Sequence, residues 1–223
     1  MEILIEKLKL FDKNRTESIN SLKIWNEVEV GNCFLPCAEE FLCNGYFLIN
    51  NEYILDLGSI ELYYHEEYDG GLKDPAMYHT NERLPKSYKD KIKKYSIENL
   101  PVFYKVINDN SGYPYFKFGS VNLHQSGVDI TFENEKKGYR ASFLIRSYRM
   151  LKKEDLKNDN ILYDPYSSHL YDDMYNAGLL SFDNNITIDW VEYHKGGNVI
   201  QCPRRNLDEK PWQFMLDGLK EIK

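Results

Sequence analysis

Short runs of aromatic and β-branched residues recur along this chain, separated by Asn, Asp, Gly and Ser. Such runs favour half-buried strands, and the polar residues between them favour turns. The runs lie at 46–49, 60–64, 102–107, 113–118, 128–132, 141–145 and 186–193. Helical signals are fewer and lie at 17–27, 85–95 and 167–177. The pattern predicts an α+β fold built on a mostly antiparallel sheet with a few flanking helices.

The length of 223 residues suits one domain, and we see no internal repeat or long linker. A single domain over 1–223 is therefore predicted. No apolar run approaches the ~20 residues that a membrane-spanning helix needs. The N-terminus places Glu2 where a secretory signal would carry positive charge. We expect a cytoplasmic protein with no membrane partner.

The four cysteines do not form a recognisable metal or disulfide pattern. Cys33, Cys37 and Cys43 are clustered and Cys202 is remote, without the paired two-residue spacings of zinc ribbons. We expect reduced thiols and no bound metal.

The net charge of −7 disfavours nucleic acid as a partner, because phosphate binding depends on Lys and Arg. The charge is uneven, however: residues 1–70 carry 14 acidic and 5 basic side chains, so the rest of the chain is slightly positive. The stretches 83–95 and 136–157 are distinctly basic. Each is either a solvated face or a local patch that contacts phosphates.

Several motifs occur in one order along the chain. In 60–83, Glu66-Glu67-Tyr68 is followed by a Gly-Gly turn, by Asp74-Pro75-Ala76 and by His79. This segment resembles the active-site segment of the alkyladenine (methylpurine, 3-methyladenine) DNA glycosylase family, in which a strand-borne Glu-x-Tyr precedes a Gly turn and a His.

Other segments extend the resemblance from about residue 34 to 218, leaving 1–33 as an N-terminal extension. Residues 38–48 look like the family's opening helix and strand. Residues 113–132 and 139–151 look like its DNA-inserting hairpin and a strand that ends in Leu-Leu-Arg. Residues 202–218 are similar to its closing Pro-Arg and Lys-Pro-Trp pattern. The resemblance implies a curved sheet that carries this hairpin.

The resemblance also implies roles for particular residues. Glu66 would be the general base that activates a water, and Arg146 would be the cation beside that carboxylate. Phe118 would be the wedge at the hairpin tip that enters the minor groove. The remaining roles are stacking or pocket residues (Tyr68, His79 with Tyr78 as its rival, Tyr115, and Asp129 where the family has an asparagine) and contacts to the DNA backbone (Arg204, Arg205, Lys195).

The resemblance as a whole implies a monofunctional DNA glycosylase. It would flip an alkylated or deaminated purine out of duplex DNA as a monomer, hydrolyse the N-glycosidic bond without a cofactor, and so initiate base excision repair. Without the resemblance, each site residue has an ordinary structural explanation as a surface acid, a core aromatic or an edge arginine. Two alternatives stay open: a non-catalytic member that binds DNA or modified bases, and an acidic partner-binding protein of the immunity or anti-defence type.

Overall fold

A computed structural model describes residues 2–21, 24–77, 80, 115–124, 127–157, 169–179, 187–204 and 209–219. Several predictions lie outside these residues: the strand at 102–107, the helix and basic stretch between 83 and 95, and the site residues Tyr78, His79 and Arg205.

Two long helices open the chain, α1 (Glu2–Asn20) and α2 (Glu27–Cys43). The Asn26 side chain begins α2, because its Oδ1 accepts hydrogen bonds from the backbone N–H groups of Val28 and Glu29 at 3.0 and 3.1 Å. The single helix predicted at 17–27 is therefore wrong, since that stretch holds the link between two helices. No helix in the described part of the chain is both long and apolar enough to cross a membrane.

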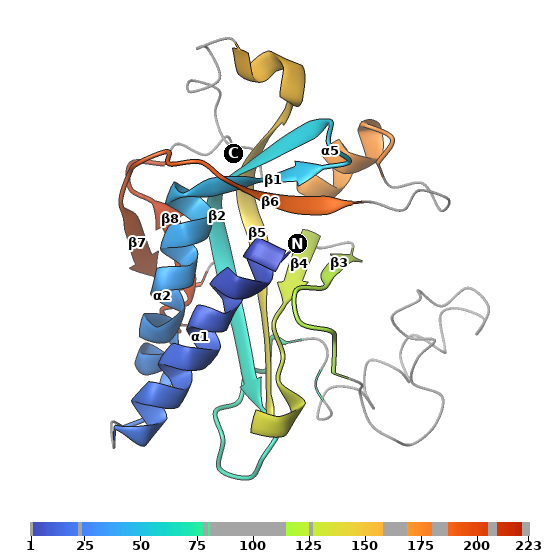
Figure 1. Cartoon of the computed structure of the whole chain (residues 1–223). Coiled ribbons are helices and arrows are strands. Elements are labelled where there is room, and N and C mark those ends of the chain that lie inside the picture. The colour runs from blue at the N-terminus through green and yellow to red at the C-terminus, as the bar shows by residue number, and fades with distance from the viewer. Residues whose placement is uncertain are drawn as a thin grey trace, which may run out of the picture.

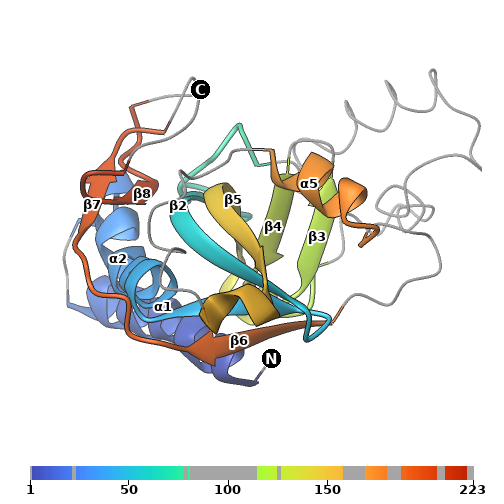
Figure 2. The same cartoon turned by 90° about the horizontal axis from the view of Figure 1, so that it is seen from above.

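The strands form one antiparallel, curled sheet (Figures 1 and 2). The strand order is β3-β4-β5-β2-β1-β6, and β8 pairs with both β2 and β7. This arrangement confirms the predicted α+β fold. The strands are β1 (Gly45–Ile49), β2 (Tyr53–Glu66), β3 (Val121–His124), β4 (Gly127–Thr131), β5 (Tyr139–Lys152), β6 (Ile188–Glu192), β7 (Val199–Cys202) and β8 (Gln213–Leu216).

Shorter elements connect the strands. They are the 3₁₀ turns η2 (Glu135–Lys137) and η3 (Lys153–Lys157) and the helix α5 (Leu170–Asn176), which lies within the helix predicted at 167–177. The strand predicted at 113–118 is not found in its described part. There Phe116 N–H donates to the Glu133 carboxylate at 2.7 Å, and Lys117–Ser120 close a turn with Gly119 at φ 80°.

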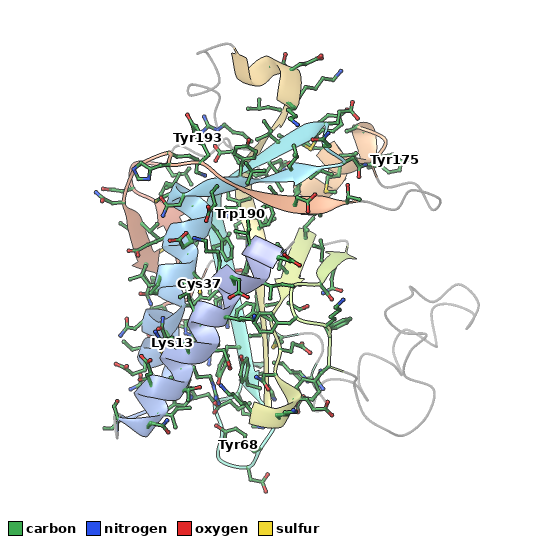
Figure 3. The ribbon with its side chains drawn as sticks, viewed as in Figure 1. Lys13, Cys37, Tyr68, Tyr175, Trp190 and Tyr193 are labelled. Atoms are coloured by element: carbon green, nitrogen blue, oxygen red, sulfur yellow. The ribbon has the colours of Figure 1, made fainter. Side chains whose placement is uncertain are left out.

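The core lies between α1, α2 and one face of the β2–β5 ribbon. Phe34 of α2 stacks on Phe132 and meets Phe214 edge to face, while Phe11 of α1 packs edge to face against Tyr64 of β2. Figure 1 shows both helices lying along this ribbon, and Figure 3 places Cys37 among them. We call this side of the ribbon the helix face.

The opposite side of the ribbon, which we call the polar face, is buried as well but carries charged side chains. Alternation along β2 sends Leu62 and Tyr64 to the helix face and Glu61, Tyr63 and His65 to the polar face. All three of the latter are at most 7% exposed. Buried charges are tolerated only when they are paired. The ion pairs on this face are therefore examined for a candidate site.

Candidate active site on the β2–β5 ribbon

Glu66, the expected general base, lies on the helix face and is 1% exposed. Its Oε1 accepts hydrogen bonds from Arg15 Nη2 at 2.6 Å, from the Tyr64 hydroxyl at 2.6 Å and from Trp25 Nε1 at 3.1 Å. Its Oε2 accepts one from the backbone N–H of Leu72 at 2.9 Å. The carboxylate thus joins β2 to α1, to the link between the helices and to the following loop.

These donors decide the acidity of Glu66. Burial alone would raise its pKa, but hydrogen bonds from Tyr64, the Leu72 backbone, Tyr68 and Arg15 outweigh burial and lower the pKa below its ordinary value. The lowered pKa makes Glu66 a weaker base than an ordinary glutamate. The geometry fits a structural anchor better than a group that takes a proton from water.

Arg146 is paired with a different carboxylate. Its Nε donates to Glu61 Oε2 at 2.7 Å, and its Nη2 donates to the same oxygen and, at 2.9 Å, to the Tyr63 hydroxyl. Tyr63 in turn donates its hydroxyl hydrogen to Glu61 Oε2 at 2.8 Å. The expected pairing of Arg146 with Glu66 is therefore wrong, because the two residues lie on opposite faces of the ribbon.

A β-bulge aims Arg146 at Glu61. In β5, Ile145 pairs with Ile60 and Ser147 pairs with Ser59, so that Arg146 has no partner in the register. Gly58 is the corresponding extra residue of β2, between the pairs formed by Leu57 and Ser59. Bulges often redirect a side chain next to a functional site.

Burial and neighbouring charges together set the pKa values of Tyr63 and Arg146 in the Glu61 cluster. Burial raises the pKa of Tyr63, and the neighbouring Glu61 raises it further, so that Tyr63 keeps its hydroxyl hydrogen. Burial lowers the pKa of Arg146, but Tyr63 and Glu61 more than offset this and the net shift is upward. The Glu61 side chain is fully buried, whereas that of Arg146 is 30% exposed and forms the open edge of the cluster.

Two other predicted pocket residues also lie near the polar face. Asp129 stands opposite Leu144 of β5, which pairs with Glu61, and its charge contributes to the raised pKa of Tyr63. Tyr115 instead covers the guanidinium of Arg140, whose Cζ lies 4.1 Å from the ring centroid. Arg140 and Leu144 are four residues apart on one strand, or about 13 Å. Tyr115 therefore belongs to a neighbouring polar cluster.

Tyr68 and Phe118 are placed differently from the expected roles. Tyr68 follows the end of β2, is 44% exposed and hydrogen-bonds to Glu66, far along the ribbon from Glu61 (Figure 3). Phe118 is half-buried and packs edge to face on Phe132. It precedes β3, whereas the last described pair of the β3–β4 hairpin is His124 with Gly127, so the expectation that Phe118 forms the hairpin tip is wrong.

Arg204 and Lys195, the expected contacts to the DNA backbone, are paired within the protein. Arg204 is 2% exposed and binds Asp74 through two hydrogen bonds of 2.8 and 3.0 Å. Lys195 donates to Asp56, with a side chain that is 13% exposed. Burial lowers the pKa of Lys195 and Asp56 only partly offsets it. The prediction that Arg204 contacts the DNA backbone is wrong in this structure, because its guanidinium is enclosed.

The sequence contained a signal for the carboxylate that pairs with Arg146. Glu61-Leu62-Tyr63 is itself a Glu-x-Tyr on the same strand, five residues before Glu66-Glu67-Tyr68. Sequence reasoning chose the second copy because a Gly-Gly turn follows it. The structure places the first copy beside Arg146.

Comparison with known proteins adds no evidence on function to the contacts described above. No protein-family model, curated protein or solved structure matches the chain. Among the described residues, no group of three or more His, Cys, Asp or Glu side chains could hold a metal ion.

Proposed function

We propose that the chain is a DNA N-glycosylase that hydrolyses the bond between a damaged purine and its deoxyribose, with Glu61 as the general base in place of Glu66. One observation carries this proposal: Arg146, at the bulge within β5, donates two hydrogen bonds to a Glu-x-Tyr carboxylate on a single buried face. This is the combination that the resemblance to the alkyladenine DNA glycosylase family requires.

The proposed reaction needs only a water molecule besides the DNA. Glu61 takes one proton from the water while the water oxygen bonds to C1′ of the sugar. The bond from C1′ to the base nitrogen breaks, and the base leaves with the electron pair and takes up a proton from solvent, to which Glu61 returns the proton that it took from the water. Arg146 compensates the buried negative charge of Glu61.

Access to the pair would come from the edge formed by Arg146. Glu61 is enclosed, but about a third of the Arg146 side chain meets solvent. Substrate that reaches this edge meets a cation that can order a water beside the Glu61 carboxylate. Asp129 would add a hydrogen-bond acceptor near Tyr63, where an asparagine amide could also donate.

Single-turnover release of a base from an oligonucleotide duplex tests the proposal. The duplexes carry alkylated adenine or hypoxanthine, and salt is kept low at first because an acidic protein binds DNA weakly. We expect excision by the wild type and a loss of about 10²- to 10⁴-fold in Glu61→Gln, the range for removal of a general base.

Glu66→Gln is the matched control, because it makes the same chemical change five residues away on the same strand. It should keep the rate of the chemical step in the fraction of molecules that is folded. Loss of excision in Glu66→Gln with full activity in Glu61→Gln would reverse the assignment of the base. Absence of release from every duplex by the wild type would reject the catalytic proposal and favour a protein that only binds.

A further inference from the structure

Arg204 occupies an unusual position for an arginine, between two aromatic rings and a carboxylate. Its guanidinium carbon lies 4.9 Å from the centroid of the Tyr63 ring and 5.1 Å from that of Trp212. Both Nη atoms donate to Asp74, at 2.8 and 3.0 Å. The planar fork of arginine suits two parallel hydrogen bonds to one carboxylate and can also lie against aromatic rings.

Asp74 is itself fixed to β2 and cannot follow a shift of Arg204. Its carboxylate accepts hydrogen bonds from the backbone N–H groups of Tyr64, at 3.3 Å, and Ala76, at 3.0 Å. Its own N–H donates to His65 Nδ1 at 3.2 Å. Asp74 is 1% exposed. The guanidinium is therefore held in place relative to the strand that carries Glu61.

The Tyr63 ring is confined on this support. Tyr63 shares a small buried cluster with Met77 and Leu144, and Arg204 covers one face of its ring. Its hydroxyl is both the donor to Glu61 Oε2 and an acceptor from Arg146 Nη2. A change of χ1 that swings the ring sideways would carry the hydroxyl away from both partners, whereas rotation about the Cβ–Cγ axis would leave it in place.

We infer that Arg204 is a positioning residue of the Glu61–Arg146 pair, acting through the ring of Tyr63. Sequence reasoning gave this residue a contact with DNA, whereas its contacts make it an internal support. The catalytic consequence of this inference rests on the proposed function. The mechanical link from Arg204 to the Tyr63 hydroxyl does not.

The link is tested without substrate by titrating Tyr63. Tyrosines labelled with ¹³C at Cζ are followed by NMR against pH, and the Tyr63 signal is assigned by its absence in Tyr63→Phe. In the wild type, Tyr63 should not titrate with the ordinary tyrosines near pH 10, because burial and Glu61 raise its pKa. In Arg204→Lys, which keeps the charge but loses the planar fork, the midpoint should fall far enough toward that ordinary value for Tyr63 to begin to titrate alongside the other tyrosines.

Arg149→Lys is the matched control for the titration. Arg149 also lies buried on the ribbon and pairs with a carboxylate, Asp56, through hydrogen bonds of 3.1 and 2.5 Å. It should leave the Tyr63 signal unchanged. If Arg204→Lys does not fold, Asp74→Asn removes the charge that orients Arg204 and should move Tyr63 in the same direction. An unchanged Tyr63 titration in a folded variant of either kind would overturn the inference.

Kinetics separate positioning from general damage. On a duplex that the wild type cleaves, Arg204→Lys should lower kcat by about 10- to 100-fold with KM nearly unchanged. Tyr63→Phe should lower kcat through the same contact. The double variant Arg204→Lys/Tyr63→Phe should therefore have a kcat no lower than that of the slower single variant. Additive losses would overturn the inference. If no duplex is cleaved, the proposed function fails while the titration still decides the link.

Discussion

Glu61 and Glu66 are the same residue type on the same strand, each two residues before a tyrosine, yet their surroundings are opposite. An odd separation of five residues sends their side chains to different faces of the ribbon. Glu66 is bonded to Arg15, whose side chain is 5% exposed, and is closed in by Trp25 and the Leu72 backbone. Glu61 is bonded to Arg146, which reaches solvent. The Glu-x-Tyr motif supplies the same carboxylate in both places. The face of the strand on which it lies decides whether its arginine partner reaches solvent.

Among the variants that test the difference between Glu61 and Glu66, Arg15→Met should cause the largest loss of stability. It leaves the Glu66 charge buried with its main cation removed, and breaking a buried pair in this way costs about 3–5 kcal/mol. The loss should appear as a lower urea midpoint at pH 7.

Arg146→Met is the matched control, because it removes the same group from the other pair. Water can reach its site, so the loss of stability should be smaller. Equal losses in the two variants would mean that the two ion pairs are not as different as the exposure of their arginines suggests.

Glu66→Gln should have an intermediate effect. An amide still accepts hydrogen bonds but leaves Arg15 without its counter-charge, so we expect a loss of about 1–3 kcal/mol in urea unfolding at pH 7. The loss should depend on pH. The folded pKa of Glu66 lies below its ordinary value of 4.5, so its contribution is fully present above that pH and declines as pH falls through and below it. The variant should therefore show a flatter acid limb than the wild type, and parallel acid limbs would contradict the anchor role.

Tyr68→Phe should have the smallest effect. The Tyr68 side chain is 44% exposed and hydrogen-bonds to Glu66, which already holds four other donors. Removing its hydroxyl should cost less than about 1 kcal/mol in thermal or urea unfolding. It should leave base excision unchanged, because Tyr68 belongs to the anchor at Glu66. A large loss of excision with normal stability would move the site back toward the end of β2.

The fold class was predictable because local patterns decide it. Alternating aromatic and β-branched residues identified runs that lie in or overlap β1, β2, β4, β5 and β6. The boundary between the two helices was missed, because the stretch that holds it reads as helical until Asn26 is seen as a cap. The run at 115–118 reads as a strand, but its backbone bonds to Glu133 instead of a neighbouring strand.

The site was only partly predictable, because its decisive contacts join distant positions. Arg146 and Asp129 were identified as site residues, and the structure brings both toward Tyr63. The partner of Arg146 could not be chosen, since two Glu-x-Tyr copies lie on one strand. Arg15 lies 51 residues from Glu66, in a region treated as an extension, so nothing local indicates that it supplies the cation for Glu66.

The paired bulge at Gly58 and Arg146 has a consequence for how such a sequence can change. Because β2 and β5 each carry one extra residue, the side-chain alternation of both strands is inverted at the same point. Paired residues therefore point to the same face of the sheet on both sides of the bulge. An in-frame deletion of the codon for Gly58 alone would invert the alternation of one half of β2 relative to the other. Glu61 would then face Phe34 and Phe143, and Leu62 would face Arg146. Insertions or deletions at the two positions are therefore expected to occur together in related sequences.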